Sequence, residues 1–270
     1  MHTNKERAAM KKRLETWRVQ SPEKEGFHEI FTPGKNDCAA VHVFRLNLPK
    51  GATHIFHSCE LELHPVLLHG AARITDGPLQ GKTMSRFDSF YIPGNTKSCV
   101  EAVEDCVFYV AGAICDGIGK PSFRQYDATL PIGDIHQIHG AGAGRREVMF
   151  TLDPATPASR LICGLTWGGV GAWTSWPPHQ HEQDLEEAYC YFDMPAPAFG
   201  LHISYLHSGE FEDLVAHPVS SGTMVLAPRG YHPTVASPAT RNTYLWILAA
   251  FTPESRSYDL AVLDPAYAKT

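Results

Sequence analysis

The stretch that decides the fold reads GAWTSWPPHQHEQDLEEAYCYF and spans residues 171–192. Its last six residues alternate polar or aromatic side chains with small or apolar ones, which is the period of a β-strand that faces an interior on one side. Before them stands His-x-His, and in an extended segment residues i and i+2 point to the same face. The stretch therefore predicts a strand entry that aims His179 and His181 into one space.

Short segments of similar character recur along the chain. They are rich in β-branched and aromatic residues and are bounded by Gly, Pro, Asn or Asp, as is typical of strands joined by turns. The chain has 22 Gly and 20 Pro, which suits many turns. The segments expected as strands are 39–48, 64–74, 89–94, 106–114, 160–169, 187–194, 199–206, 222–228 and 243–251. They predict an all-β fold.

The two halves of the chain repeat one pattern. In each half an apolar strand runs into a Pro-Gly corner, I-P-G at 92–94 and A-P-R-G at 227–230, before a last apolar strand. This duplication predicts two jelly-roll-like β-barrels in tandem. We expect a helical extension, a barrel without metal, a connecting segment and a metal-binding barrel, over residues 1–24, 25–115, 116–158 and 159–270.

Two segments outside the expected barrels carry patterns of their own. Residues 7–18 have helical composition with Met10, Leu14 and Trp17 on one face, so we expect a short N-terminal helix that packs or forms an oligomer contact. GAGAGRR (140–146) superficially suggests a phosphate loop, but it lacks the Lys-Ser/Thr of a P-loop. We interpret it as a turn-forming linker.

Composition excludes several classes of partner. A net charge of −6 implies no general surface for polyanions, so nucleic acid is not expected. No apolar run approaches the roughly 20 residues of a membrane span, and the first residues are too polar for a secretory signal. Seven scattered cysteines form no CxxC, which favours reduced thiols and a cytoplasmic protein. Exposed barrel edges and the N-terminal helix are compatible with a homo-oligomer.

Two carboxylates follow the histidine pair, and strand parity separates them. One face of the strand carries a polar set and the other a small or apolar set, namely Glu187, Tyr189 and Tyr191 against Ala188, Cys190 and Phe192. Polar groups suit an interior that holds a ligand. We therefore assign Glu187 to the site and Glu186 to solvent or an outer position, with Glu186 as the alternative ligand.

A later corner supplies the last candidate ligand. About forty-five residues after the glutamates, Pro-x-Gly-x-His presents His232, which would complete three imidazoles and one carboxylate. Such a set predicts one divalent ion with positions open for water or substrate. Zinc is expected, and manganese, iron, cobalt and nickel also fit the ligand set. The matching corner of the first half has no histidine, so the first barrel is expected to lack metal.

Other residues of the second half are candidates for contact with a small-molecule substrate. Arg229 lies in the corner that presents His232, and its guanidinium could bind a carboxylate, although a corner salt bridge fits it almost as well. Trp176 could stack on a sugar face. The base that would move a proton is not identified by the sequence, and Tyr189 and Tyr231 are its candidates.

Three motifs resemble those of the bicupin sugar-acid isomerases, whose branches are 5-deoxy-glucuronate isomerase and 5-keto-4-deoxyuronate isomerase. They are W-P-P-H-Q-H-E (176–182), E-E-A-Y-C-Y (186–191) and V-L-A-P-R-G-Y-H-P (225–233). The resemblance implies two cupin barrels and carries the metal-ligand role onto His179, His181, Glu187 and His232. The short spacing between His181 and Glu187 departs from the first branch, which usually has a longer insert there.

The resemblance implies a metal-dependent aldose–ketose isomerase. Its expected reaction is conversion of 5-deoxy-glucuronate to 5-dehydro-2-deoxy-gluconate in inositol catabolism. Two other functional interpretations of the same residues remain. Three histidines and a glutamate can hold Fe(II) in a cupin dioxygenase, and a cupin can also bind a sugar without turning it over.

Overall fold

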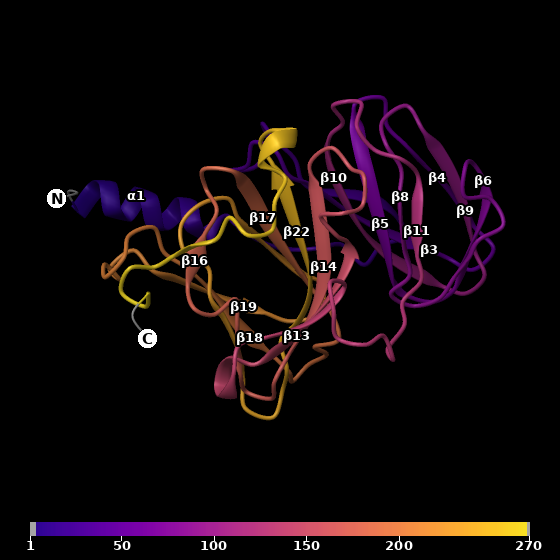
Figure 1. The fold of residues 1–270 in the computed structure, drawn as a ribbon. Helices are drawn as coiled ribbons and strands as arrows, with labels where there is room; N and C mark the ends of the chain where they lie inside the picture. The colour runs from indigo at the N-terminus through magenta and orange to yellow at the C-terminus, as the bar shows by residue number, and fades with distance from the viewer. Residues whose placement is uncertain (1–3, 269–270) are drawn as a thin grey trace.

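The computed structural model describes residues 4–268, which form one helix and two β-barrels side by side (Figure 1). The helix α1 (Asn4–Glu15) lies beside the second barrel, on the side away from the first. Residues 1–3 and 269–270, which belong to the expected terminal segments, lie outside the described residues. The prediction of an all-β fold with two tandem barrels and a short N-terminal helix is confirmed.

Each barrel consists of one large and one small antiparallel sheet. In the first barrel the large sheet has the order β11 (Ser122–Arg124), β8 (Ser89–Tyr91), β5 (Leu61–His69), β10 (Cys106–Ile114), β3 (His42–Leu48) and β2 (Gly26–Phe31). Its small sheet has the order β4 (Thr53–His57), β9 (Lys97–Ala102), β6 (Ala72–Asp76) and β7 (Thr83–Met84).

The second barrel repeats this plan. Its large sheet has the order β1 (Arg18–Gln20), β20 (Thr223–Ala227), β17 (Leu185–Tyr191), β22 (Thr243–Ala250), β14 (Leu161–Gly168), β13 (Arg146–Leu152) and β12 (His136–His139). Its small sheet has the order β15 (Trp173–Thr174), β21 (Thr234–Ala236), β18 (Gly200–Ser204) and β19 (Val215–Val219). A separate pair joins β16 (His179–Gln180) to β23 (Val262–Leu263). Short 3₁₀ turns cover Gly142–Gly144 and Pro253–Ser255.

Three apolar cores follow from this plan. One fills each barrel, and a third lies between the two large sheets, where side chains of β5 and β10 meet those of β14, β17 and β22. All eight residues of β22 are buried because the strand has a barrel interior on one face and the other barrel on the opposite face. Strands buried on both faces read as continuous apolar runs, which explains TYLWILAA in the sequence.

Two buried glutamates connect the barrels in a reciprocal way. Glu186 of the second barrel accepts hydrogen bonds from the backbone N–H groups of Ala39, Ala40 and Val41 at 2.7, 2.7 and 3.1 Å, just before β3. Glu62 of the first barrel accepts from the N–H groups of three residues that lead into β14, at 2.7–2.8 Å: Ser159, Arg160 and Leu161. Each carboxylate therefore satisfies backbone donors that would otherwise be buried without a partner.

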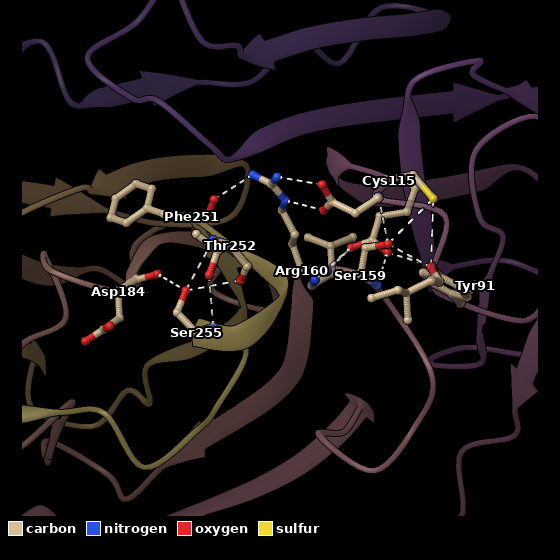
Figure 2. A network of polar contacts seen from close by, with 12 residues as sticks. Tyr91, Cys115, Ser159, Arg160, Asp184, Phe251, Thr252 and Ser255 are labelled. Atoms are coloured by element: carbon tan, nitrogen blue, oxygen red, sulfur yellow. Dashed lines mark hydrogen bonds and ion pairs between the residues drawn. The ribbon is translucent and has the colours of Figure 1, made fainter.

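Further contacts hold the chain around Glu62. Tyr91 donates its hydroxyl hydrogen to the Glu62 carboxylate at 2.6 Å. Figure 2 shows Arg160 reaching from this junction to the carbonyl oxygen of Phe251 at 2.8 Å. At the left of the same view, Ser255 donates to the carbonyl of Asp184 at 2.9 Å. The entry to β14 is thus held from both barrels.

The expected connecting segment, 116–158, is largely built into the barrels, which corrects that boundary. Its strand β11 pairs with β8, and β12 and β13 form a hairpin that extends the large sheet of the second barrel beyond β14. The glycine-rich stretch between β12 and β13 is the hairpin turn. Gly140 has a φ of +66°, and a Cβ there would lie 2.3 Å from the Gly144 carbonyl oxygen. Gly142, with a φ of +54°, also takes a left-handed conformation, so two of the glycines that suggest a linker are suited to the turn.

The expected N-terminal extension is also part of the second barrel. The helix ends at Glu15, earlier than expected, because residues 18–20 pair as β1 with β20. Leu14 and Trp17 are each 1% exposed and belong to the core between the barrels. Trp17 donates its indole N–H to Asp37 at 2.9 Å. Among residues 4–268, no helix is long and apolar enough to cross a membrane.

We expect Glu186→Gln to lower the free energy of unfolding by about 2–3 kcal/mol, because an amide replaces the charged acceptor and turns one of its ends into a donor facing backbone N–H groups. Urea unfolding of the metal-free protein measures this change. The matched control is Glu104→Gln, at an exposed glutamate, which should shift stability by less than about 0.5 kcal/mol. Equal effects of the two substitutions would contradict the role given to Glu186.

Candidate metal centre

Four side chains from separate elements of the second barrel converge at one point. His179 lies in β16, His181 just after it, Glu187 in β17, and His232 between β20 and β21. One ligand atom from each of the four lies within 4.8 Å of all the others. These are the four residues that the sequence predicted as metal ligands, and the structure brings all of them together.

Alternation along β17 decides which glutamate faces the histidines. Tyr189 and Tyr191 join the core inside the second barrel, whereas Ala188 and Cys190 join the core between the barrels. Glu187 therefore points into the barrel. Glu186 points outward but does not reach solvent, since it is 3% exposed and bound to amides of the first barrel. The expectation of a solvent position for Glu186 is wrong, because the outer face of this strand is covered by the other barrel.

The protonation states of the cluster favour a cation. Burial, followed by the neighbouring His232 and His181, lowers the pKa of His179 to about 3, so this imidazole is neutral near pH 7. Burial alone would raise the pKa of Glu187, but contacts with His181 and His232 outweigh burial and hold its pKa below the ordinary value. A neutral imidazole and an ionised carboxylate are the forms that bind a divalent ion.

Hydrogen bonding at the ring nitrogens also fits a metal site. The Nδ1 atoms of His179 and His232 lie 2.8 and 3.1 Å from the carbonyl oxygens of Pro177 and Gly230. Nδ1–H donation to these carbonyls leaves the Nε2 lone pairs free. Oε2 of Glu187 and Nε2 of His232 are buried 3.0 Å apart, yet neither makes a hydrogen bond. Such unsatisfied atoms are what a bound ion would satisfy, so the residues present fit the implied metal.

The cluster opens into a cavity of about 340 Å³ inside the second barrel. Trp176 and Tyr189, two of the predicted contact residues, line it. The ring of Trp176 lies against Trp173 and Tyr267, with ring centroids 5.0 and 5.1 Å away. Tyr189 is buried, and its hydroxyl group donates to the Ser175 hydroxyl at 3.0 Å.

Two other predicted contact residues do not line the cavity. Arg229 points toward the first barrel and pairs with Asp37 at 2.6 Å, so the corner salt bridge is what the structure shows. The prediction that Arg229 binds substrate is therefore not supported by its position. Tyr231 lies against the ring of Tyr205, with centroids 5.1 Å apart, and is not among the described residues that line the cavity.

The sequence reasoning missed other residues that line the cavity. They are His139 and Arg146 on the β12–β13 hairpin, Tyr244 and Trp246 on β22, and Tyr258 and Asp259 near the C-terminal end of the described chain. Tyr244, Trp246 and Leu248 alternate along a predicted strand, so parity could have placed them on the inner face. His139 and Arg146 carried no such signal, because their segment reads as a glycine-rich linker.

The segment after β22 covers one side of the cavity. β23 pairs with β16, so that Val262 lies opposite Gln180 and Leu263 opposite His179. Asp264 holds this segment in place: its backbone N–H donates to the Pro178 carbonyl at 2.8 Å, and its carboxylate accepts from the Tyr205 hydroxyl at 2.6 Å. The histidine pair is thus held between the barrel and this segment.

We expect His232→Ala and Glu187→Gln to bind less than about one tenth as much zinc as the unmodified protein, because each removes a ligand from a buried set. Metal content after dialysis, measured by inductively coupled plasma mass spectrometry, checks this. Glu186→Gln and His139→Ala are matched controls that should keep about one ion per chain. Full metal content in His232→Ala, or loss of metal in Glu186→Gln, would argue against this ligand set.

Comparison with known proteins places this geometry in a family. The model of the KduI/IolB family matches residues 17–268. Two proteins named 5-deoxy-glucuronate isomerase, from Geobacillus kaustophilus (strain HTA426) and Geobacillus thermodenitrificans (strain NG80-2), are 32% and 30% identical to the chain over 246 residues. The matches cover 85% of the chain and 86% and 87% of the two relatives.

Solved structures agree on the fold. The crystal structure of an IolB-like protein from Salmonella typhimurium LT2 superposes with a TM-score of 0.79 at 21% identity, covering 94% of this chain and 98% of that one. Oxalate decarboxylase from Bacillus subtilis superposes with a TM-score of 0.57 at 13% identity, covering 86% and 76%. At these identities the likeness shows a cupin fold and not an activity. The match over residues 17–268, together with relatives at 30% identity or more, shows that the chain belongs to the KduI/IolB family.

Proposed function

We propose that the protein is a metal-dependent aldose–ketose isomerase that converts 5-deoxy-glucuronate to 5-dehydro-2-deoxy-gluconate, a step of inositol catabolism. One observation carries the proposal: the His179, His181, Glu187 and His232 cluster is buried beside a cavity of about 340 Å³, and the first three of these residues line it. Relatives named for this isomerisation match 85% of the chain, in support of the substrate.

The buried cluster suits this reaction. A divalent ion, which we propose to be zinc, would supply a Lewis acid for the oxygens on the two reacting carbons of an aldose. The chain surrounds that position with the aromatic side chains of Trp176, Tyr244 and Trp246, which limit access of water. The three imidazoles and one carboxylate would hold the ion, and substrate oxygens would bind it only where its coordination expands beyond these four protein ligands.

Protonated phenols line the same space. Burial, followed by the charge of Glu187, raises the pKa of Tyr189 well above its ordinary value, and burial also raises the pKa of Tyr244. Both phenols therefore keep their protons near pH 7. We propose that the Tyr189 hydroxyl turns from Ser175 to donate its one hydrogen bond to a substrate oxygen when substrate binds, and that Tyr189 is not the base that removes a proton.

The direct test is proton NMR of 5-deoxy-glucuronate with the purified, zinc-loaded protein in D₂O. We expect the aldose signals to be replaced by those of the ketose, with no oxygen consumed and with no turnover after chelation. Consumption of oxygen with a phenolic or diketone substrate, without isomerisation, would instead indicate a cupin dioxygenase. Binding of the sugar acid without any turnover would indicate a non-catalytic sugar-binding cupin and would rule out the proposal.

We expect Tyr189→Phe to lower kcat about ten- to a hundredfold with unchanged zinc content, because it removes one hydrogen-bond donor from the cavity. Steady-state kinetics on 5-deoxy-glucuronate measure the effect. Tyr231→Phe is the matched control, since it removes the same hydroxyl group from a tyrosine outside the cavity, and it should leave kcat unchanged. If both variants retain full kcat, the role proposed for Tyr189 is incorrect.

A further inference from the structure

One wall of the cavity carries a positively charged side chain that does not belong to the His–Glu cluster. Arg146, the first residue of β13, lines the cavity together with His179, His181 and Glu187. Among the described residues that line this cavity, Arg146 is the one arginine or lysine. His139 adds no second charge, because burial, followed by the charge of Arg146, lowers its pKa and keeps it neutral.

The guanidinium of Arg146 has only backbone partners. Its Nη1 donates to the carbonyl oxygens of Trp176 at 3.0 Å and Gly144 at 3.4 Å. The adjacent Glu147 lies 2.8 Å from His136 instead, and Glu187 is in contact with the histidines. Across residues 4–268, no carboxylate oxygen lies within the 4.0 Å ion-pair distance of Arg146.

Arg45 and Arg256 also lack a carboxylate partner, but two or three nitrogens of each guanidinium donate to Asn47, Ser21 or backbone carbonyl oxygens. Three other partly buried arginines form ion pairs. Arg160 pairs with Asp116 at 2.6 Å, Arg229 pairs with Asp37 at 2.6 Å, and Arg124 pairs with Asp153. A partly buried charge without a counter-charge lowers the stability of the folded protein. Such charges are often found at functional sites, where a bound ligand supplies the opposite charge. The free N–H groups of Arg146 present the geometry that a carboxylate fits.

The backbone holds Arg146 in place. It lies opposite His139 across the hairpin and opposite Gly168 in β14. The hairpin turn packs on the cavity wall, since a Cβ on Gly144 would meet Trp176 Cδ1 at 3.4 Å. The turn and Trp176 thus provide the two carbonyl oxygens that orient the guanidinium. Orientation before binding reduces the entropy lost when a ligand binds.

Arg146 and the metal cluster also face a common space. The phenols of Tyr244 and Tyr258 line the cavity, and the charges of both Arg146 and Glu187 act on each of them. For both phenols burial raises the pKa most, while Arg146 opposes it. Asp259 also lines this space but is exposed, so solvent screens its charge. A ligand in the cavity can therefore lie near the cluster and near Arg146 at the same time.

We propose that Arg146 binds the carboxylate of a sugar acid and thereby sets the preference of this cavity for acidic over neutral sugars. The position of the reacting carbons at the His–Glu cluster rests on the function proposed above. The binding of the carboxylate by Arg146 does not depend on turnover. Arg146 takes the role that the sequence suggested for Arg229.

The test compares D-glucuronate with D-glucuronamide, which replaces the carboxylate by a neutral amide of similar shape. Isothermal titration calorimetry measures both dissociation constants for the zinc-loaded protein. We expect the unmodified protein to prefer the acid by about tenfold or more, Arg146→Met to bind both equally, and Arg146→Lys to keep part of the preference. Arg229→Met is the matched control and should keep the full preference.

Two results would overturn the proposal. One is a full preference for the acid in Arg146→Met, as expected if the carboxylate bound the metal ion instead. The other is no preference in the unmodified protein. Metal content and thermal unfolding of each variant show whether the site has survived the substitution, and Arg146→Lys retains the charge if Arg146→Met does not fold. Preference without conversion of 5-deoxy-glucuronate would refute the proposed function but not the role of Arg146.

Discussion

The structure depends on two carboxylates that bind the backbone of the opposite barrel. Glu186 and Glu62 each accept hydrogen bonds from three consecutive amides, and together they join the two large sheets over a shared apolar core. On β17 this junction also determines which glutamate faces the barrel interior, because neighbouring residues of a strand point to opposite faces. Once Glu186 is held against the first barrel, Glu187 must face the interior of the second. The contact between the barrels and the placement of the predicted metal ligand Glu187 therefore depend on opposite faces of the same strand.

The alternation of side chains along strands predicted much of the fold and the His–Glu cluster. Where the predictions from this alternation were wrong or incomplete, the reasons are physical. The alternation placed Glu187 inward, but it could not show that the outer face of Glu186 is covered by another barrel, because that burial involves residues about 145 positions away. It missed β12 and β13, since the glycines that the hairpin turn requires look like a linker. Arg229 lies outside the cavity for a different reason. Nearness to His232 in sequence does not fix the direction of a side chain at a corner, and the Arg229 guanidinium pairs with Asp37, away from the cavity.

The cupin architecture leaves the chemistry open. An oxalate decarboxylase shares the two-barrel plan at 13% identity, so the fold alone separates neither substrates nor reactions. Active sites on this fold differ from one another in the side chains that line the cavity inside the barrel. Here the metal cluster shares its cavity with protonated phenols and with a guanidinium that lacks a carboxylate partner. Arg146 lies on β13, near the outer end of the large sheet, and Tyr258 lies after its last strand in the chain, β22.

The pairing of β1 with β20 has a consequence for biosynthesis. Arg18 pairs with Val225, and the Arg18 side chain donates to the carbonyl oxygen of Pro218, 200 positions further along the chain. At about 5–20 residues per second, β1 leaves the ribosome roughly 10–40 s before the strand that it joins. During that interval the whole first barrel can fold, while Leu14, Trp17 and an unpaired strand edge stay exposed. The newly made chain thus exposes apolar side chains and a strand edge that are covered only by residues from about the last fifth of the chain, and protection by a chaperone would matter most during this interval.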